Sequence, residues 1–222
     1  MNAGWNEKAL CNWRGEEFTY CDLATQIEKF HLFFDAIGVK KGDKIAICAT
    51  NSARWAITFL AVNTYEAVIV PLLSEFTPDA VANLTHHSES IILFTDKEMW
   101  KRIDSSKVPG LLAVIAVSDF SILMAEKDVE DAYNSVESVF AAKYPDGLKP
   151  ENIHYNTDNW KNLAVINYTS GTTSAPKGVM LRYESLCASI DFAIRKIPAS
   201  FEDNIVSMLP MGHIYGMVFE FM

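Results

Sequence analysis

The sequence of 222 residues has few cysteines, no long apolar run and no excess of basic residues. Its four cysteines, Cys11, Cys21, Cys48 and Cys187, form no C-x-x-C pair, which excludes a metal knuckle and a disulfide framework. We interpret them as reduced thiols of the core. Lys and Arg number 19 against 28 Asp and Glu, a formal net charge of −9. No nucleic-acid partner is expected, because binding to phosphate backbones requires clustered positive charge.

The apolar segments are also too short for a membrane span. Runs such as residues 111–117 fall far below the roughly 20 residues that a spanning helix needs, so no transmembrane segment is expected, while peripheral membrane contact stays open. Residues 1–8 do not combine a basic region with an apolar run, so no signal peptide is predicted. These features favour a cytoplasmic location.

What the chain does contain is typical of a folded domain: 50% hydrophobic and 12% aromatic residues. Over residues 19–38, apolar side chains recur at helical spacing opposite polar ones, which predicts an amphipathic helix. Thr19 and Asp22 have the spacing of a capping box. Gly38 can end the helix in the left-handed conformation.

Short apolar segments rich in β-branched residues alternate with further amphipathic segments. Strands are expected at residues 44–49, 67–72, 91–94, 111–117 and 163–167. Helices are expected at residues 53–65, from about 78, at 97–103 and at 130–143. This alternation predicts an α/β fold, a mostly parallel sheet covered by helices on both faces.

The pattern weakens after residue 119, and turn-forming and polar residues dominate from Asp146 to Trp160. We expect a first α/β subregion over residues 1–145, a connector over 146–160, and the start of a second subregion over 161–222.

Hydroxyl side chains cluster after the last of these strands. Five of the six residues from Thr169 to Ser174 are Ser or Thr, the sixth is Gly171, and Lys177 follows. Hydroxyls and backbone amides can surround phosphate oxygens, a glycine allows close backbone approach, and a lysine adds positive charge. The loop 168–178 is therefore a candidate anion site.

The loop is not a Walker phosphate loop. That motif has Gly directly before the Lys and Ser or Thr after it, whereas Pro176 precedes Lys177 and Gly178 follows. Residues 178–181 also have the pattern of a strand, so the loop is expected to join two strands as a hairpin. The alternative at this point is a surface hairpin whose Ser, Thr, Gly and Pro only form the turn.

The loop sequence closely resembles the phosphate-loop signature of the adenylate-forming superfamily, which includes acyl-CoA synthetases, firefly-type luciferases and peptide-synthetase adenylation domains. The matching residues are 168–173 and 176–179. Residues 18–20, 38–43, 51–55 and 59–72 also resemble the N-terminal region of the family, whereas 97–160 match it poorly. The resemblance implies the partial N-terminal domain of an acyl-CoA synthetase-like fold.

A second element of the family is found at residues 209–216, Leu-Pro-Met-Gly-His-Ile-Tyr-Gly. In acyl-activating members, a histidine or aromatic residue at the position of His213 borders the acyl pocket. Taken alone, a single histidine in an apolar stretch is more often a core residue with a hydrogen-bond partner. The surrounding motif favours a position at the acyl pocket for His213.

The resemblance implies that a carboxylate, in this case a fatty acid, attacks the α-phosphorus of ATP to give an acyl-adenylate and pyrophosphate. A thioester to coenzyme A then follows. A carboxylic acid with a pKa of about 4–5 is already ionised at neutral pH, so the enzyme's task is electrostatic. The residues implied to bind ATP phosphates are Thr169, Ser170, Gly171, Thr172, Thr173 and Lys177. Thr172 is also implied to help hold Mg²⁺, which prefers oxygen ligands.

In the family, the adenine, ribose and metal residues and the adenylating lysine lie further along the chain, so no catalytic residue is assigned within residues 1–222. The sequence ends in the apolar segment 218–222. We therefore interpret it as an N-terminal fragment of a fatty acid–CoA ligase, inactive alone. Apolar surface left by an incomplete sheet can promote self-association.

Two positions depart from the family pattern. Ser174 stands where glycine is usual, and a positive φ there would strain the loop tip. Arg182-Tyr183 replaces the common Thr-His after the second strand. A stand-alone module that binds nucleotide or phosphate without catalysis is the alternative function. Coenzyme A and a carrier-protein thiol are both compatible acceptors.

Overall fold

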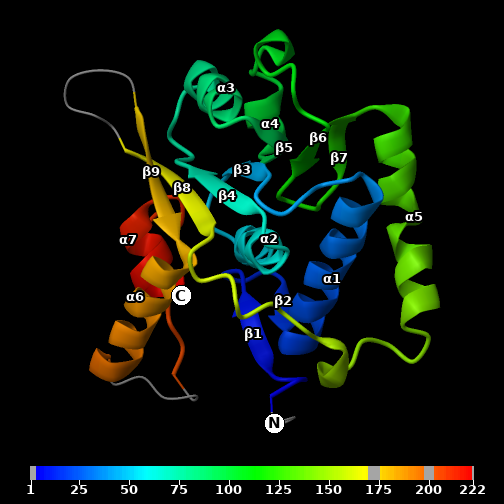
Figure 1. Ribbon diagram of the computed structural model, residues 1–222, viewed down its shortest axis with the longest axis vertical. Helices are drawn as coiled ribbons and strands as arrows, with labels where there is room; N and C mark the ends of the chain where they lie inside the picture. Colours follow the sequence, from blue (N-terminus) through cyan, green and yellow to red (C-terminus); the bar gives the residue numbers. More distant parts are fainter. Residues whose placement is uncertain (1–3, 170–175, 198–202, 222) are drawn as a thin grey trace.

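The computed structural model describes residues 4–169, 176–197 and 203–221 (Figure 1). Within these residues, the centre is a seven-stranded sheet in the order β7-β6-β5-β3-β4-β8-β9. The strands are β3 (Lys44–Cys48), β4 (Val68–Leu72), β5 (Ser90–Thr95), β6 (Ala113–Ala116), β7 (Ile122–Ala125), β8 (Leu163–Thr169) and β9 (Lys177–Arg182). The pairs between β6 and β8 are parallel, and β7 and β9 run antiparallel at the two edges. The predicted mostly parallel sheet is confirmed.

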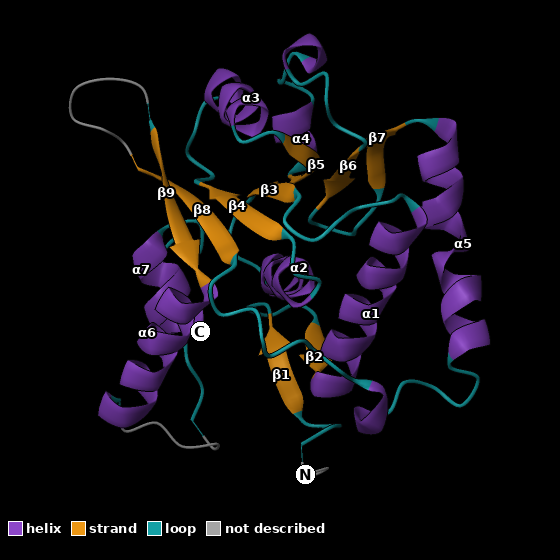
Figure 2. Ribbon diagram, viewed as in Figure 1, coloured by secondary structure: helices purple, strands orange, loops and turns teal. Residues whose placement is uncertain are grey.

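Helices cover both faces of this sheet (Figure 2). The longer ones are α1 (Tyr20–Ala36), α2 (Ala53–Thr64), α3 (Pro78–His87), α5 (Lys127–Lys143) and α6 (Tyr183–Lys196). Shorter turns are α4 (Lys97–Trp100), η1 (Ser105–Lys107), η2 (Pro150–Asn152), α7 (Ile214–Gly216) and the π-helical turn η3 (Met217–Phe221). None of the helices in the described ranges is both long and apolar enough to traverse a bilayer.

Each central strand contributes side chains to two hydrophobic cores, because successive side chains point to opposite faces of the sheet. In β3, Ile45 and Ile47 pack with α1 and α2 in one core, while Ala46 and Cys48 pack with α3 in the other. The same alternation in β5 places Phe94 in the first core and Leu93 in the second. Burial on both faces explains why these strands are almost purely apolar.

The ends of α1 follow from local sequence. Thr19 and Asp22 form the predicted capping box, and Gly38 has a φ of +76° just beyond the C-cap. These groups satisfy backbone atoms that have no partner inside the helix. The prediction of this helix is confirmed.

Other expectations are corrected. The predicted helix 97–103 is a single turn, α4, and the antiparallel strand β7 was not expected. A two-stranded sheet of β1 (Lys8–Cys11) and β2 (Glu17–Thr19) also precedes α1. The four cysteines are free, but only Cys48 is buried. The interpretation of all four as core thiols is therefore wrong, because outside β3 the apolar pattern does not continue around them.

The partly buried side chain of His31 gives the fold a titratable group between α1 and α2. Its Nε2 lies 3.1 Å from the carbonyl oxygen of Ala61, and burial lowers the pKa of His31. Its ordinary value is about 6.5.

Because the folded-state pKa is the lower one, the unfolded chain takes up the proton first as pH falls. The free energy of unfolding should therefore be at its full value above about pH 6.5 and decrease below it, with a limiting slope of about 1.36 kcal/mol per pH unit. Urea titrations between pH 7.5 and pH 5 measure the slope. A His31→Gln variant should lose this component, and identical slopes in the two proteins would contradict the prediction.

Candidate functional site

The predicted hairpin is present as the pair β8–β9 at one edge of the sheet (Figure 1). Thr169 and Lys177 end the two strands and lie opposite one another in the register. Both side chains are exposed, and neither has an ion pair or side-chain hydrogen bond among the described residues. Four other predicted phosphate ligands, Ser170, Gly171, Thr172 and Thr173, lie outside the described residues, as does Ser174. At the base of the loop, the hairpin thus presents a hydroxyl and an ammonium group that have no side-chain partner within residues 4–169, 176–197 and 203–221.

Gly178 permits a tight fit between the two strands. A Cβ atom at this position would lie 2.9 Å from Cγ2 of Ile166 and 3.4 Å from Cε1 of Tyr168. Tyr168 is the register partner of Gly178, so its ring occupies the space that a side chain on β9 would fill. The glycine after the lysine therefore has a packing reason in addition to its place in the motif.

Tyr168 also connects the base of the loop to α3. Its hydroxyl oxygen lies 2.6 Å from Nδ1 of His87, and burial raises the pKa of Tyr168, so the hydroxyl keeps its proton at neutral pH. His87 is in the last turn of α3. No cluster of metal-ligand residues occurs in the parts of the chain that the structure covers. The contact with Tyr168 was missed because 81 residues separate the pair.

The second family-like element lies across the carboxyl ends of three parallel strands. Just after β3, the side chain of Asn51 forms hydrogen bonds with the backbone of Leu209 and Met211. At the end of β4, Leu72 lies against Gly212. In β8, Nδ2 of Asn167 donates to the carbonyl oxygen of Gly212 at 3.0 Å. Ligand sites of open α/β sheets lie at this edge, where the strand order reverses. Here β3 has β4 on one side and β5 on the other, which is such a reversal.

Gly212 lies close against the end of β4. An added Cβ would lie 2.8 Å from the carbonyl oxygen and 3.2 Å from the carbonyl carbon of Leu72. The buried Asn167 is two positions before Thr169, and Gly212 is one position before His213. One side-chain hydrogen bond thus links the strand that begins the phosphate loop to the segment that carries His213.

His213 lies on the surface and not in the core. It caps α7, where its Nδ1 accepts from the backbone N–H of Tyr215 at 3.2 Å. In the neutral ring the proton is then on Nε2, which can donate a hydrogen bond. His213 lines an apolar cavity of ≈ 490 Å³ together with residues of α6, α7 and η3: Ala188, Ser189, Phe192, Ile214, Tyr215 and Val218. The role of His213 at an acyl pocket stays a prediction.

Helix α6 forms the other wall of this cavity and was not expected from the sequence. Its Arg182-Tyr183 start departs from the family pattern, yet Tyr183 is well anchored. The hydroxyl of Tyr183 donates to the carbonyl oxygen of Asn63 on α2 at 2.7 Å. Burial raises the pKa of Tyr183, so the donor stays protonated. The tyrosine thus holds the start of α6 against the core.

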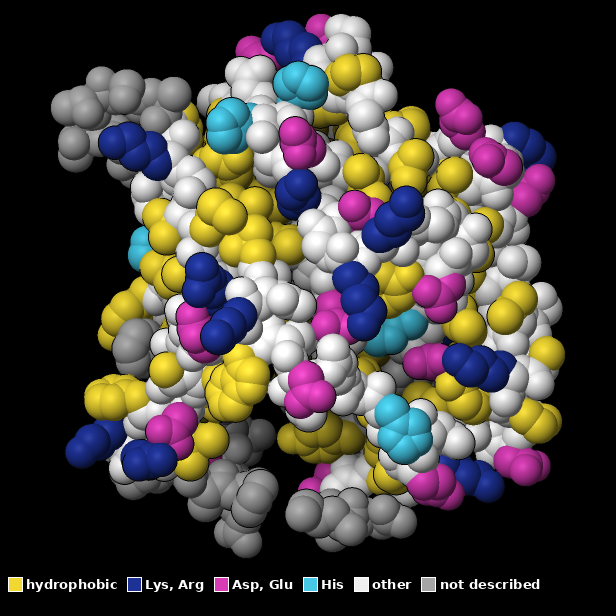
Figure 3. Space-filling view, in the orientation of Figure 1, with side chains coloured by type: hydrophobic (Ala, Val, Ile, Leu, Met, Phe, Trp, Pro, Cys, Tyr) yellow, Lys and Arg dark blue, Asp and Glu magenta, His cyan; other side chains and the backbone are white. Residues whose placement is uncertain are grey.

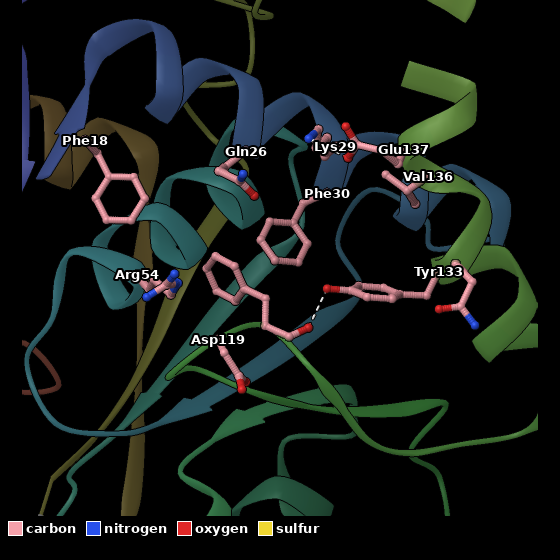
Figure 4. A pocket seen from close by; sticks show the side chains of 11 residues that line it. Phe18, Gln26, Lys29, Phe30, Arg54, Asp119, Tyr133, Val136 and Glu137 are labelled. Carbon is pink, nitrogen blue, oxygen red and sulfur yellow. Dashed lines mark hydrogen bonds and ion pairs between the residues drawn. The ribbon is translucent and has the colours of Figure 1, made fainter. Parts of the chain in front are cut away.

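A second cavity, of ≈ 380 Å³, lies among α1, α2, α5 and the turn before β7 (Figure 4). Its cations are already neutralised, because Arg54 pairs with Glu16 and Lys29 pairs with Glu137. The hydroxyl of Tyr133 donates to the carbonyl oxygen of Phe120. None of the predicted site residues lines it.

Burial also affects two acidic groups near the carboxyl ends of β3 and β5. It raises the pKa of the Cys48 thiol to about 12, so this sulfur is uncharged at neutral pH. It raises the pKa of Asp96, whose carboxylate accepts from the backbone N–H of Thr50 at 3.4 Å. Asp96 thus supports the turn after β3 that presents Asn51, whereas the Cys48 thiol donates to the carbonyl oxygen of Leu73 after β4.

Comparison with known proteins gives a consistent result over the whole chain. Residues 2–222 match the family described as AMP-binding enzyme. Probable acyl-activating enzyme 16, chloroplastic, of Arabidopsis thaliana is 30% identical over 213 residues, covering 92% of this chain and 30% of the relative. The long-chain-fatty-acid–(acyl-carrier-protein) ligase AEE15, chloroplastic, of the same plant is 29% identical, covering 92% and 29%.

Solved structures show the same fold. The crystal structure of ATP-bound MatB from Rhodopseudomonas palustris superposes with a TM-score of 0.77 at 20% sequence identity, covering 99% of this chain and 40% of that one. The chain therefore spans about a third of the length of the curated relatives and two fifths of this structure.

Proposed function

Because the chain belongs to the AMP-binding enzyme family of adenylate-forming enzymes, we propose that it is the N-terminal part of an ATP-dependent ligase that activates a carboxylate. The carboxylate oxygen attacks the α-phosphorus of ATP, a C(O)O–P bond forms, and the bond to pyrophosphate breaks. The acyl group then passes to a thiol, with release of AMP. We propose a fatty acid as the carboxylate and coenzyme A as the thiol.

One observation carries the proposal: the bond between Asn167 and Gly212. It joins the strand that ends in Thr169 to the segment that begins the wall of the apolar cavity at His213. In an acyl-adenylate-forming site, the nucleotide phosphates and the acyl carboxylate must meet, since one attacks the other. The linkage supports such a meeting point at the carboxyl edge of the sheet.

The residues at the base of the loop suit an anionic substrate. Lys177 has no carboxylate partner among the described residues, and so its charge is available to a triphosphate. Thr169 offers a hydroxyl opposite it. In the proposal, Ser170, Gly171, Thr172 and Thr173 complete the phosphate cradle. Thr172 would add one oxygen to Mg²⁺, which retains water and phosphate oxygens as its other ligands.

The cavity beside His213 supports an acyl substrate with an apolar body. Its walls come from Phe192, Ile214 and Val218, and its volume of ≈ 490 Å³ lies in the range of small-molecule sites. A fatty acid agrees with the name of the AEE15 relative, which acts on long-chain fatty acids. That name gives acyl-carrier protein as the acceptor, so carrier protein is the second candidate thiol beside coenzyme A.

The proposed division of the chain follows the predicted one: a first subregion over 1–145, a connector over 146–160 and a second subregion from 161. We propose that residues 1–222 alone do not catalyse adenylation, because the adenylating lysine of the family has no counterpart in them. A cytoplasmic location and peripheral membrane contact also stay proposals, and both relatives described above are named as chloroplastic.

The test uses the complete reading frame. The gene is sequenced past codon 222, the encoded protein is purified, and fatty-acid-dependent exchange between ATP and radiolabelled pyrophosphate is measured beside residues 1–222. We expect exchange by the complete protein and none above background by residues 1–222. Absence of exchange with every fatty acid and aromatic acid tested would refute the ligase.

The alternative, a stand-alone module that binds nucleotide or phosphate, makes a different prediction. A natural stop codon after Met222, together with ATP binding by the 222-residue chain and no exchange, would favour it. Isothermal titration with ATP, AMP and pyrophosphate separates the two functions, since a complete ligase binds ATP and also turns it over.

We further propose that residues 1–222 self-associate through apolar surface at the β9 edge. Large apolar side chains are exposed on β9, on α6 and in residues 205–209; examples are Met180, Phe192, Ile194 and Met208. Figure 3 shows hydrophobic side chains over this part of the molecule. Contiguous exposed apolar surface promotes association, and so does an edge strand with unpaired backbone groups.

Sedimentation velocity at protein concentrations of about 5 to 200 μM, on the order of the dissociation constants of weak complexes, should therefore show concentration-dependent oligomers. A double substitution, Met180→Lys with Ile194→Lys, is expected to raise the dissociation constant about tenfold or more. Trp13→Lys, which changes an exposed aromatic residue in the β1–β2 turn, serves as the matched control. A monomer at every concentration would contradict the proposal.

A further inference from the structure

Most apolar side chains in the segment that leads to His213 are exposed. Ile205, Val206 and Met208 are strongly exposed, with 80% of Met208 accessible to solvent. Pro210 interrupts the backbone donors in the middle of the segment. Of the apolar side chains in residues 205–211, only that of Met211 is buried in a core, so the residues before it need other contacts to fix their position.

Asn51 supplies such contacts through both the nitrogen and the oxygen atom of its side-chain amide. Its Nδ2 donates to the carbonyl oxygen of Leu209 at 2.7 Å and to Oγ of Ser207 at 3.3 Å. Its Oδ1 accepts from the backbone N–H of Met211 at 2.8 Å. The side chain therefore bridges the backbone on either side of Pro210, which a residue with only donors or only acceptors cannot do.

The place of Asn51 in the fold makes this bridge rigid. Asn51 follows the buried strand β3 by three residues and precedes Ser52, which caps α2 by accepting from the N–H of Trp55 at 3.1 Å. Trp55 is fully buried. A side chain at a short turn between a core strand and a capped helix has little freedom, and so it can define the position of what it binds.

We propose that Asn51 is a positioning residue for the acyl substrate: by bridging Leu209 and Met211 it sets where His213 stands at the mouth of the apolar cavity. This proposal rests on the proposed ligase function for its substrate, but its structural part is independent of that function. Asn167 supports Gly212 from the phosphate-loop strand, and the carboxylate of Glu220 accepts from the backbone N–H groups of Met208 and Leu209. Asn51 acts on the acyl side of the site and has no described contact with Thr169 or Lys177.

The discriminating substitution is Asn51→Asp, because it keeps the size and shape of the side chain. It retains an acceptor for the Met211 N–H but replaces the donor to Leu209 with a carboxylate oxygen that faces a carbonyl oxygen. If Asn51 only fills space, this variant should behave as the wild type does. If it positions the segment, the variant should resemble or exceed Asn51→Ala in effect.

The first measurement is hydrogen–deuterium exchange of the 222-residue chain, followed in peptides that cover residues 208–216. We expect exchange at the Met211 amide to be about tenfold faster in Asn51→Asp and in Asn51→Ala. Asn134→Asp, at an exposed position on α5, is the matched control and should leave exchange in this segment unchanged. Protection in Asn51→Asp equal to that of the wild type overturns the proposal.

The second measurement uses the protein from the complete reading frame. Asn51→Asp should raise KM for the carboxylate about tenfold and change KM for ATP less than twofold, because the phosphate loop is anchored from β8. Equal increases in both KM values would point to a general structural role and overturn the positioning proposal. Faster exchange of Met211 in a protein with no ligase activity would refute the proposed function while leaving the bridging role of Asn51 intact.

Discussion

Replacing Gly212 with alanine is expected to displace the segment that carries His213 and to lower carboxylate-dependent pyrophosphate exchange by the complete protein about hundredfold. The added Cβ would lie 2.8 Å from the carbonyl oxygen of Leu72, a contact that real Cβ atoms do not make. Leu72 ends a buried strand and cannot yield, so the movement falls on residues 209–213. Displacement of a site element by about 1 Å is enough for a loss of this size.

The same substitution has a signature that does not depend on catalysis. The bond from Asn167 to Gly212 should be lost, and the backbone N–H of His213, which donates to Pro210, should exchange faster. We expect the free energy of unfolding to fall by only about 1–3 kcal/mol, as for other cases of overpacking.

Gly110→Ala is the matched control for this experiment, because nothing lies within 4 Å of a Cβ at that position and its φ is not in the left-handed region. It should leave activity and exchange unchanged. If Gly212→Ala retains wild-type activity and protection, the close approach to Leu72 does not position the acyl wall.

Truncating Phe34 to alanine should have the largest effect on stability, a loss of about 3–5 kcal/mol in the free energy of unfolding. Phe34 is fully buried on α1, and its ring lies 5.3 Å from that of Tyr65 and 5.9 Å from that of Phe30. The substitution removes the ring from a closely packed core and leaves a cavity that α1 cannot fill without leaving the sheet.

Urea denaturation followed by circular dichroism gives the measurement. Phe192→Ala provides the matched control, since the same atoms are removed from a side chain that is 56% exposed on α6. That variant should change stability by no more than about 0.5 kcal/mol. A similar loss in the two variants would show that α1 is not a principal part of the core.

The parts of the fold that were predicted correctly are those determined by neighbouring residues. The capping box of Thr19 and Asp22 lies within one turn of helix, and Gly38 ends that helix by its own conformational freedom. The alternation of apolar strands with amphipathic helices likewise follows from a period of two or 3.6 residues. The parallel sheet and its helices could therefore be predicted without any knowledge of long-range contacts.

Strand β7, the sheet of β1 and β2, and helix α6 were not predicted, and the patterns of the three strands are weak. The four residues of β7 are all partly buried, and β1 and β2 contain only four and three residues without a buried face. In α6 only Leu186 is buried, but Leu186, Ile190 and Ala193 do recur at helical spacing, so this helix could have been predicted from the sequence. Such elements form because neighbouring structure offers them hydrogen bonds and surface.

The candidate site divides in the same way. The sequence by itself determined the run of hydroxyls, the lysine and the hairpin around them, since residue type and turn chemistry reside in a dozen consecutive positions. Only the tertiary structure decided that Asn51 bridges Leu209 and Met211 across 160 positions and that His87 meets Tyr168 across 81. The physical reason is that a hydrogen bond between distant residues depends on where the sheet places their backbones, and no local pattern encodes that placement.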